Sequence, residues 1–234
     1  MAQSYFVWNG TDSRNMGIIM RQAAPIIRPE ERVQHVTIPG MSGDLTEIEG
    51  ENIYNSYIQT VEISVKSAAR VPAVYKWLRG SGYVTFSGEP ARQQQARVIG
   101  AVTLQKVSRN MDHWAGTVQF YCQPLKESIP DGASILTGAG TVPNNGDVAS
   151  YPLIIVTPSS TTVTLTVNGK SLVLTNASGT RRVDCLAKVI SNSGQTELYT
   201  QYSAGTFPVL NVGNNTFGGS GWSRLTIYRR ERYL

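Results

Sequence analysis

The 234-residue chain has 21 basic and 16 acidic residues, a net charge of +5, and 41% hydrophobic residues. This composition excludes a disordered chain, and no apolar run approaches the roughly 20 residues that span a bilayer. Over half of the excess positive charge falls in the last eleven residues, with no basic stripe interleaved with aromatic side chains elsewhere, so sequence-specific nucleic-acid binding is not expected.

Short segments of alternating apolar and polar residues, separated by turn residues, predict strands through the first half of the chain. The predicted strands are residues 4–9, 17–20, 32–38, 57–66, 83–86, 97–104 and 116–122. In the clearest of them Val61, Ile63 and Val65 share one face, which is typical of a half-buried antiparallel strand. Residues 39–43 are predicted to be a turn, and the polar segment 105–115 is predicted to be a loop that carries His113.

One helix is predicted, near residues 71–79. Pro72 suits a first helical turn, where its missing N–H costs nothing. Val71, Val74, Trp77 and Leu78 fall on one apolar stripe, and Gly80 and Gly82 are expected to end the helix. A lone helix among strands is expected to cover an open face or end of a sheet with Trp77 and Leu78.

Residues 123–150 are rich in Pro, Gly and Asn and predict a boundary between domains. Beyond it, strands are predicted at 151–156, 161–167, 171–175, 182–186 and 224–228, with Asn168–Gly169 as a tight hairpin turn. The pattern predicts an all-β chain with one short helix and two domains. They are a first β domain over 1–128, a linker with a first strand over 129–150, and a β-sandwich over 151–234.

Groups able to do chemistry are few. Cys122 and Cys185 lie in apolar strand patterns and are predicted to be buried free thiols. The two histidines, His35 and His113, are far apart in sequence, so no metal or cofactor site is expected. A hydrolase needs paired carboxylates or an activated nucleophile, and Asp184 stands alone, so we expect no catalytic residues.

Three carboxylates, Glu47, Glu49 and Glu51, alternate with apolar or small residues and share one face of an extended segment. Such a row could bind a cation, but no partner ligand lies near it in sequence, so a solvated edge is favoured. In the second half Tyr202 and Trp222 are candidates for an outward contact with a sugar or a protein. The competing interpretation is that Trp222, in a turn before the last strand, closes the end of the sandwich.

The chain resembles the distal tail protein (Dit) family of long-tailed, non-contractile bacteriophages. The matching motifs are residues 6–10, 12–13, 17–18, 38–44, 54–55, 77–80, 84–87, 89–90, 116–124, 183–185, 205–208, 210, 213–214 and the arginine-rich strand at the end. Each motif consists of strand and turn residues and is weak alone. Their order over nearly the whole chain carries the resemblance.

The resemblance implies an N-terminal β-sandwich belt domain with one helix and a C-terminal sandwich similar to galectins or carbohydrate-binding modules. It implies a homohexameric ring at the tail tip of the virion, assembled in the host bacterial cytoplasm. The implied partners are the tail-tube protein, the tape-measure protein and the tail-tip hub protein. Receptor-binding proteins, carried through the outward domains of the ring, are a further implied partner. In some relatives a long inserted arm holds receptor-binding proteins, and this chain lacks that insertion. The alternative function is recognition of host cell-surface polysaccharide by a carbohydrate-binding module-like protein.

A ring through which DNA passes must not hold phosphates tightly, because each phosphate contact adds attraction. We therefore expect the arginines at 229–232 to lie outside the ring and the channel to be neutral or acidic. Glu47, Glu49 and Glu51 are the candidate channel carboxylates.

Overall fold

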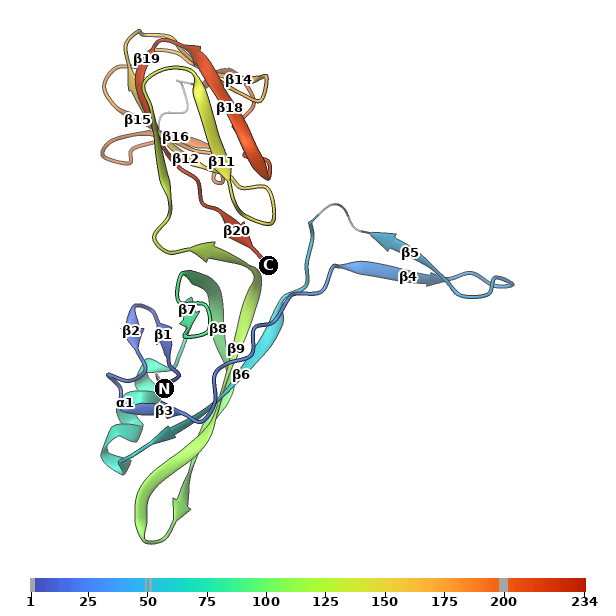
Figure 1. The fold of residues 1–234 in the computed structure, drawn as a ribbon, viewed down its shortest axis with the longest axis vertical. Helices are drawn as coiled ribbons and strands as arrows, with labels where there is room; N and C mark the ends of the chain where they lie inside the picture. Colours follow the sequence, from blue (N-terminus) through green and yellow to red (C-terminus); the bar gives the residue numbers. More distant parts are fainter. Residues whose placement is uncertain (1–2, 49, 51, 198–201) are drawn as a thin grey trace. The chain divides into compact units, whose positions relative to one another are not determined.

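The computed structural model of the chain describes residues 3–48, 50, 52–197 and 202–234. Two compact units form: unit 1 is Met1–Lys126 with Leu234, and unit 2 is Glu127–Tyr233 (Figure 1). Across the described residues the regular structure is nearly all strand, with one α-helix, so the predicted fold class is confirmed.

Unit 1 is built on one antiparallel sheet, in which strands follow the order β2-β1-β7-β8-β9-β6-β3. The bounds are β1 Phe6–Trp8, β2 Thr11–Asp12, β3 Ile18–Met20, β6 Tyr57–Val65, β7 Ser81–Phe86, β8 Arg92–Ser108 and β9 Met111–Ser128. The register of β6 on β9 places Tyr57 opposite Cys122 and Val65 opposite Trp114. Alternate residues of these strands face a shared core, which includes Phe6, Trp8 and Phe120.

The predicted helix is confirmed as α1, Val71–Trp77, preceded by a 3-10 turn, η1, at Ala68–Arg70. Val74 and Leu78 are buried in the core of unit 1. The Trp77 ring stacks on Phe6 with 5.6 Å between ring centroids, so the helix covers one face of the sheet as expected. Gly80 has a positive φ of 78°, whereas Gly82 lies within β7 and does not end the helix.

The segment predicted as a loop, 105–115, is instead the end of a long hairpin. β8 continues to Ser108 and β9 begins at Met111, so only Arg109 and Asn110 form the turn, and His113 lies in a strand. Residues 105–112 are exposed on both faces. A strand without a buried face has no reason to alternate apolar and polar residues, and this is why its sequence resembles a loop.

A second hairpin, β4 (Val33–Thr37) and β5 (Asp44–Ile48), forms a two-stranded sheet of its own, separate from the main sheet. The first strand and the turn after it agree with the sequence prediction, but β5 was not predicted. Figure 1 shows this hairpin extending away from the sheet of unit 1.

Unit 2 is a pair of five-stranded antiparallel sheets around one core. One sheet has the order β10-β19-β12-β15-β16 and the other has the order β11-β18-β13-β14-β17. The bounds are β10 Ala133–Leu136, β11 Gly140–Asn144, β12 Leu153–Pro158, β13 Val163–Val167, β14 Lys170–Leu174, β15 Arg181–Asp184, β16 Val189–Asn192, β17 Tyr202–Gly205, β18 Gly213–Ser220 and β19 Trp222–Tyr228, with a short β20 at Arg232–Tyr233.

In unit 2 the sequence correctly predicted the hairpin turn at Asn168–Gly169, because few residue pairs tolerate the backbone angles of this turn. Asn168 and Gly169 have φ values of 49° and 78°, as a two-residue hairpin turn requires, and they join β13 to β14. The range 129–150, predicted as a linker with a first strand, contains two strands. β10 pairs with β19 and β11 pairs with β18. β18 was not predicted at all.

Candidate assembly interface

The β4–β5 hairpin has two chemically different faces, which its register defines. Val36 pairs with Leu45 and Gln34 with Glu47, so these four side chains share one face. The other face carries His35 opposite Thr46 and Thr37 opposite Asp44. On that face Thr37 Oγ1 donates a hydrogen bond of 2.8 Å to Asp44 Oδ1, and Thr46 Oγ1 lies 3.2 Å from His35 Nδ1. One face is therefore mostly polar and internally bonded, whereas the other combines the aliphatic pair Val36 and Leu45 with Gln34 and Glu47.

The face of Val36 and Leu45, called the apolar face for that pair, is exposed to solvent in the single chain. Four large apolar side chains of the hairpin lie between 39% and 51% exposed: Val36 and Leu45 on this face, and Ile38 and Met41 in the segment that joins the two strands. An isolated two-stranded hairpin is marginally stable in water, and a long, exposed, apolar strand pair is a template for association. We refer to Val36, Ile38, Met41, Leu45 and Glu47 as the hairpin surface. It has the composition of an interface and lacks a partner within the part of the chain that the structure describes.

Of the three candidate channel carboxylates, the structure describes one. Glu47 lies on β5, exposed, and shares its face with Val36 and Leu45. Glu49 and Glu51 lie outside the described residues.

A basic pocket of about 280 Å³ opens on unit 1, and sequence analysis did not find it. Its lining residues come from three separate segments: Gln3, Arg14, Gly17, Ile18, Ile19, Lys66 and Arg70. Arg14 is paired with Asp12 and lies over the ring of Tyr5, 4.0 Å from its centroid. Within the described chain, Lys66 and Arg70 have no ion-pair partner. The pocket therefore presents two uncompensated cations beside the exposed edge of β3.

Gly17 explains how Arg70 reaches this pocket. The glycine has a φ of +72°, and a Cβ on it would overlap the Arg70 guanidinium. The Arg70 side chain thus lies directly over the backbone of the turn that precedes β3. A side chain at position 17 would displace it.

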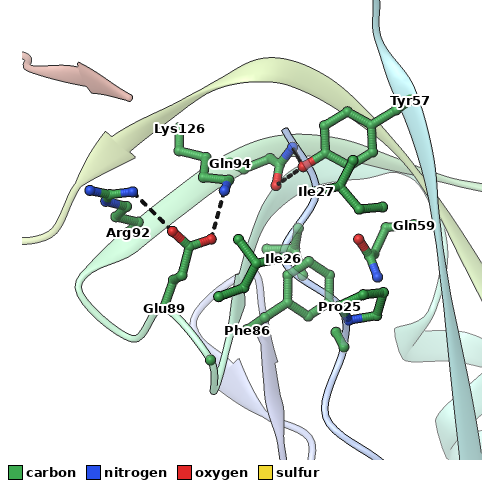
Figure 2. Close-up of a pocket in the computed structure, with 13 residues that line it drawn as sticks. Pro25, Ile26, Ile27, Tyr57, Gln59, Phe86, Glu89, Arg92, Gln94 and Lys126 are labelled. Atoms are coloured by element: carbon green, nitrogen blue, oxygen red, sulfur yellow. Dashed lines mark hydrogen bonds and ion pairs between the residues drawn. The ribbon is translucent and has the colours of Figure 1, made fainter. Parts of the chain in front are cut away.

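A second pocket of unit 1 is small and internally compensated (Figure 2). Glu89 Oε1 accepts from Arg92 NH1 at 2.9 Å, and its Oε2 lies 2.6 Å from Lys126 Nζ. Gln94 Nε2 donates to the Tyr57 hydroxyl at 2.8 Å. Burial raises the Tyr57 pKa to about 12, with the Gln94 hydrogen bond acting in the opposite direction.

The room inside this pocket is about 20 Å³, enough for one water molecule. Gln59 lines it, and within the described residues its buried Nε2 has no hydrogen-bond partner. An ordered water there would satisfy this donor. A space of this size does not hold a substrate.

Arg229 and Arg230, near the C-terminus, are paired with carboxylates inside unit 2. Arg230 makes two hydrogen bonds to Asp184, of 2.8 and 2.9 Å, so Asp184 does not stand alone. Arg229 NH1 lies 2.9 Å from Glu231 Oε1, and the Arg232 guanidinium lies 5.2 Å from the centre of the Tyr151 ring. Sequence reasoning missed the pair of Asp184 and Arg230 because these two residues are distant along the chain.

The structure describes the side chain of only one of the two candidate contact residues, Trp222 and Tyr202. Trp222 is partly buried and packs against the core of unit 2, as the first residue of β19 and not in a turn. The side chain of Tyr202 lies outside the described part of the structure. No observation on the described residues favours a sugar site at this position.

Both cysteines are free and buried, as predicted. Burial raises the Cys122 pKa to about 12 and also raises the pKa of Cys185. The described residues include no group of three His, Cys, Asp or Glu side chains placed to hold a metal ion. Nor do they include a helix long and apolar enough to cross a membrane.

No family model matches the chain, and no curated protein sequence matches it. Its structure is similar to the crystal structure of the Dit protein (gp 19.1) of phage SPP1, presented as a paradigm of the hub adsorption apparatus in phages that infect Gram-positive bacteria. The TM-score is 0.80 with 18% sequence identity, and the match covers 100% of both chains. At this identity the likeness shows the fold: the chain has the fold of that distal tail protein.

Proposed function

We propose that this chain is a structural protein of a phage tail tip, in which six copies form a ring around a channel that lets DNA pass. The ring joins the last tail-tube ring and the end of the tape-measure protein to the tail-tip hub. The observation that carries the proposal is the full-length likeness to a distal tail protein, which includes both units. In this role the chain acts through its assembled shape and not through catalysis.

The hairpin surface supports self-assembly. A ring of identical copies uses head-to-tail contacts, in which one patch of each copy meets a different patch of the next. Such a contact needs an exposed surface that is worth burying. Val36, Ile38, Met41 and Leu45 supply one, on an element that extends away from the sheet.

The pairing of Arg229 and Arg230 is consistent with a channel that does not retain DNA. Attraction to DNA scales with the number of phosphates that free cations neutralise. Arg229 and Arg230 are neutralised by Glu231 and Asp184, so they contribute little of that attraction. Glu47 is the described candidate for a channel carboxylate.

Light scattering on the chain as it leaves a size-exclusion column tests the proposal. A ring gives about six times the 25.5 kDa mass of one chain, either alone or after mixing with the tail-tube and hub proteins of the same phage. Negative-stain images of that fraction should show a particle with a central hole. A chain that stays monomeric at high concentration and in both mixtures would contradict the ring.

A further inference from the structure

We infer that the basic pocket lined by Arg14, Lys66 and Arg70 receives the hairpin surface of a second copy of this chain, with Glu47 facing Lys66 and Arg70. The inference rests on the proposed function, because it names the two patches that meet when copies assemble. It also gives Glu47 a role other than lining the channel.

The pocket is built to take a carboxylate. Three cationic side chains converge on a space of about 280 Å³, and among the described residues Arg14 alone of the three has a carboxylate partner, Asp12. The arrangement leaves Lys66 and Arg70 available, and a Glu side chain fits the donors of both. Ile18 and Ile19 add apolar surface to the same lining.

The hairpin surface has the complementary composition. Glu47 lies on the same face as Val36 and Leu45, so a carboxylate and aliphatic side chains approach a partner together. The acidic group of the other face, Asp44, is already bonded to Thr37. The face of Glu47 therefore combines exposed aliphatic side chains with a carboxylate that has no ion-pair partner among the described residues.

The positions of the two patches suit a head-to-tail contact. In the view of Figure 1 the hairpin extends from one side of unit 1, whereas β2, β3 and α1 lie at the opposite side. Arg14 follows β2, Ile18 and Ile19 belong to β3, and Arg70 directly precedes α1. Two five-residue strands extend about 17 Å at roughly 3.3 Å per residue, which allows the hairpin to reach beyond its own unit.

Because the hairpin and the elements of the pocket lie on different sides of unit 1 in Figure 1, the contact joins two molecules. Each copy then provides one hairpin and one pocket. Repetition of this contact gives a ring if the rotation closes.

Charge reversal tests the contact by its effect on association. Arg70→Glu alone and Glu47→Arg alone should each weaken self-association about tenfold or more, because each places like charges together. The double variant Glu47→Arg with Arg70→Glu restores the opposite pairing and should recover most of the affinity. Lys76→Glu makes the same change in net charge on the exposed side of α1, outside the pocket lining, and should leave association near that of the parent chain.

Chemical cross-linking reports the contact even if no stable ring forms. Glu47→Cys and Arg70→Cys chains are mixed at high concentration and treated with a short bifunctional maleimide, to which the buried native cysteines are not accessible. Heterodimers should form several times faster than in a mixture of Glu47→Cys with Lys76→Cys. High salt should reduce the yield, because it screens the ion pairs.

The outcomes separate this inference from the ring itself. Specific cross-linking without a hexamer supports the contact and leaves the ring unsupported. A hexamer whose mass resists both single reversals overturns the contact and leaves the ring intact. Equal cross-linking at positions 70 and 76 also overturns it.

Discussion

Lys126 Nζ lies 2.6 Å from Glu89 Oε2, and the Lys126 side chain is only 5% exposed. The other carboxylate oxygen of Glu89 lies 2.9 Å from Arg92 NH1, on a guanidinium that is more exposed (Figure 2). One carboxylate therefore compensates two cations in the core-facing pocket of unit 1. Loss of that carboxylate would leave an almost fully buried ammonium without a counter-charge, which is costly in a region of low dielectric.

The first prediction concerns this pair. Glu89→Gln should lower the free energy of unfolding of unit 1 by about 3 kcal/mol. Arg92→Gln should cost less than about 1 kcal/mol, because it removes a partly exposed pair and leaves the buried one intact. Urea unfolding followed by tryptophan fluorescence measures both, since three of the four tryptophans lie in unit 1. If both variants lost the same free energy of unfolding, the burial of Lys126 would not determine the cost of removing Glu89.

The second prediction concerns the acid sensitivity of unit 2. Burial alone would raise the pKa of Asp184, but hydrogen bonds from Arg230 and from the backbone of Ala187 and Leu186 outweigh it and hold the pKa below its ordinary value. A carboxyl group whose pKa is lower in the folded state stabilises the fold above its unfolded pKa of about 4. That stability is lost as the pH falls through the folded value.

Unit 2 should therefore lose stability below about pH 4, and Asp184→Asn should remove part of that dependence. The variant should be less stable than the parent at pH 7, and the difference should shrink as the pH is lowered. Thermal unfolding between pH 2 and 7, with both chains in the same buffers, provides the measurement. A constant difference across that range would contradict the assignment.

The sequence predicted elements whose residues carry their own conformational signal. Pro72 and the apolar stripe through Val74 and Leu78 located α1 because both features act within one helix. Asn168–Gly169 located a hairpin because few residue pairs adopt two successive positive φ values. The alternation in β6 was clear because one of its faces is buried and the other is largely solvated.

Elements defined by their neighbours could not be predicted. β18 has four consecutive residues, Gly213–Thr216, with little apolar character, and two glycines near its end, so no strand signal is present. The basic pocket is missed for a similar reason. Arg14, Lys66 and Arg70 are spread over more than 50 residues and meet only when β2, β3 and η1 are in place.

The third prediction concerns two neighbouring glycines of β18, Gly218 and Gly219, which differ in the space around them. Gly219 has a φ of +116°, and a Cβ on it would overlap the Thr164 carbonyl oxygen on the paired strand β13. A Cβ on Gly218 would have no other atom within 4 Å. Gly219→Ala should therefore cost about 3 kcal/mol of the stability of unit 2, through backbone strain and overpacking, whereas Gly218→Ala should stay within about 1 kcal/mol. The two neighbouring variants are matched controls in a denaturant titration, and similar costs would refute the close approach.

The fourth prediction uses the cysteines as probes of unfolding. Only the thiolate reacts readily, and burial both raises the pKa of Cys122 to about 12 and blocks access to it. Cys185 is buried in unit 2 in the same way. Native protein at pH 8 should therefore take up no thiol reagent, and protein in urea should take up two equivalents. Labelling of one cysteine in the native state, located by mass spectrometry, would show which unit opens first.

The last prediction separates folding from assembly at the hairpin. Val36→Ser with Leu45→Ser removes two apolar side chains that are already about 40% exposed, so the stability of unit 1 should change by less than about 0.5 kcal/mol. If a partner buries them, the same change removes about 1 kcal/mol per side chain from association, which weakens it more than tenfold. Thr46→Ser on the polar face of the same hairpin is the control and should affect neither quantity. Sedimentation equilibrium gives the association constant and thermal unfolding gives the stability. Loss of stability without loss of association would mean that the apolar face serves the hairpin itself and not a neighbouring copy.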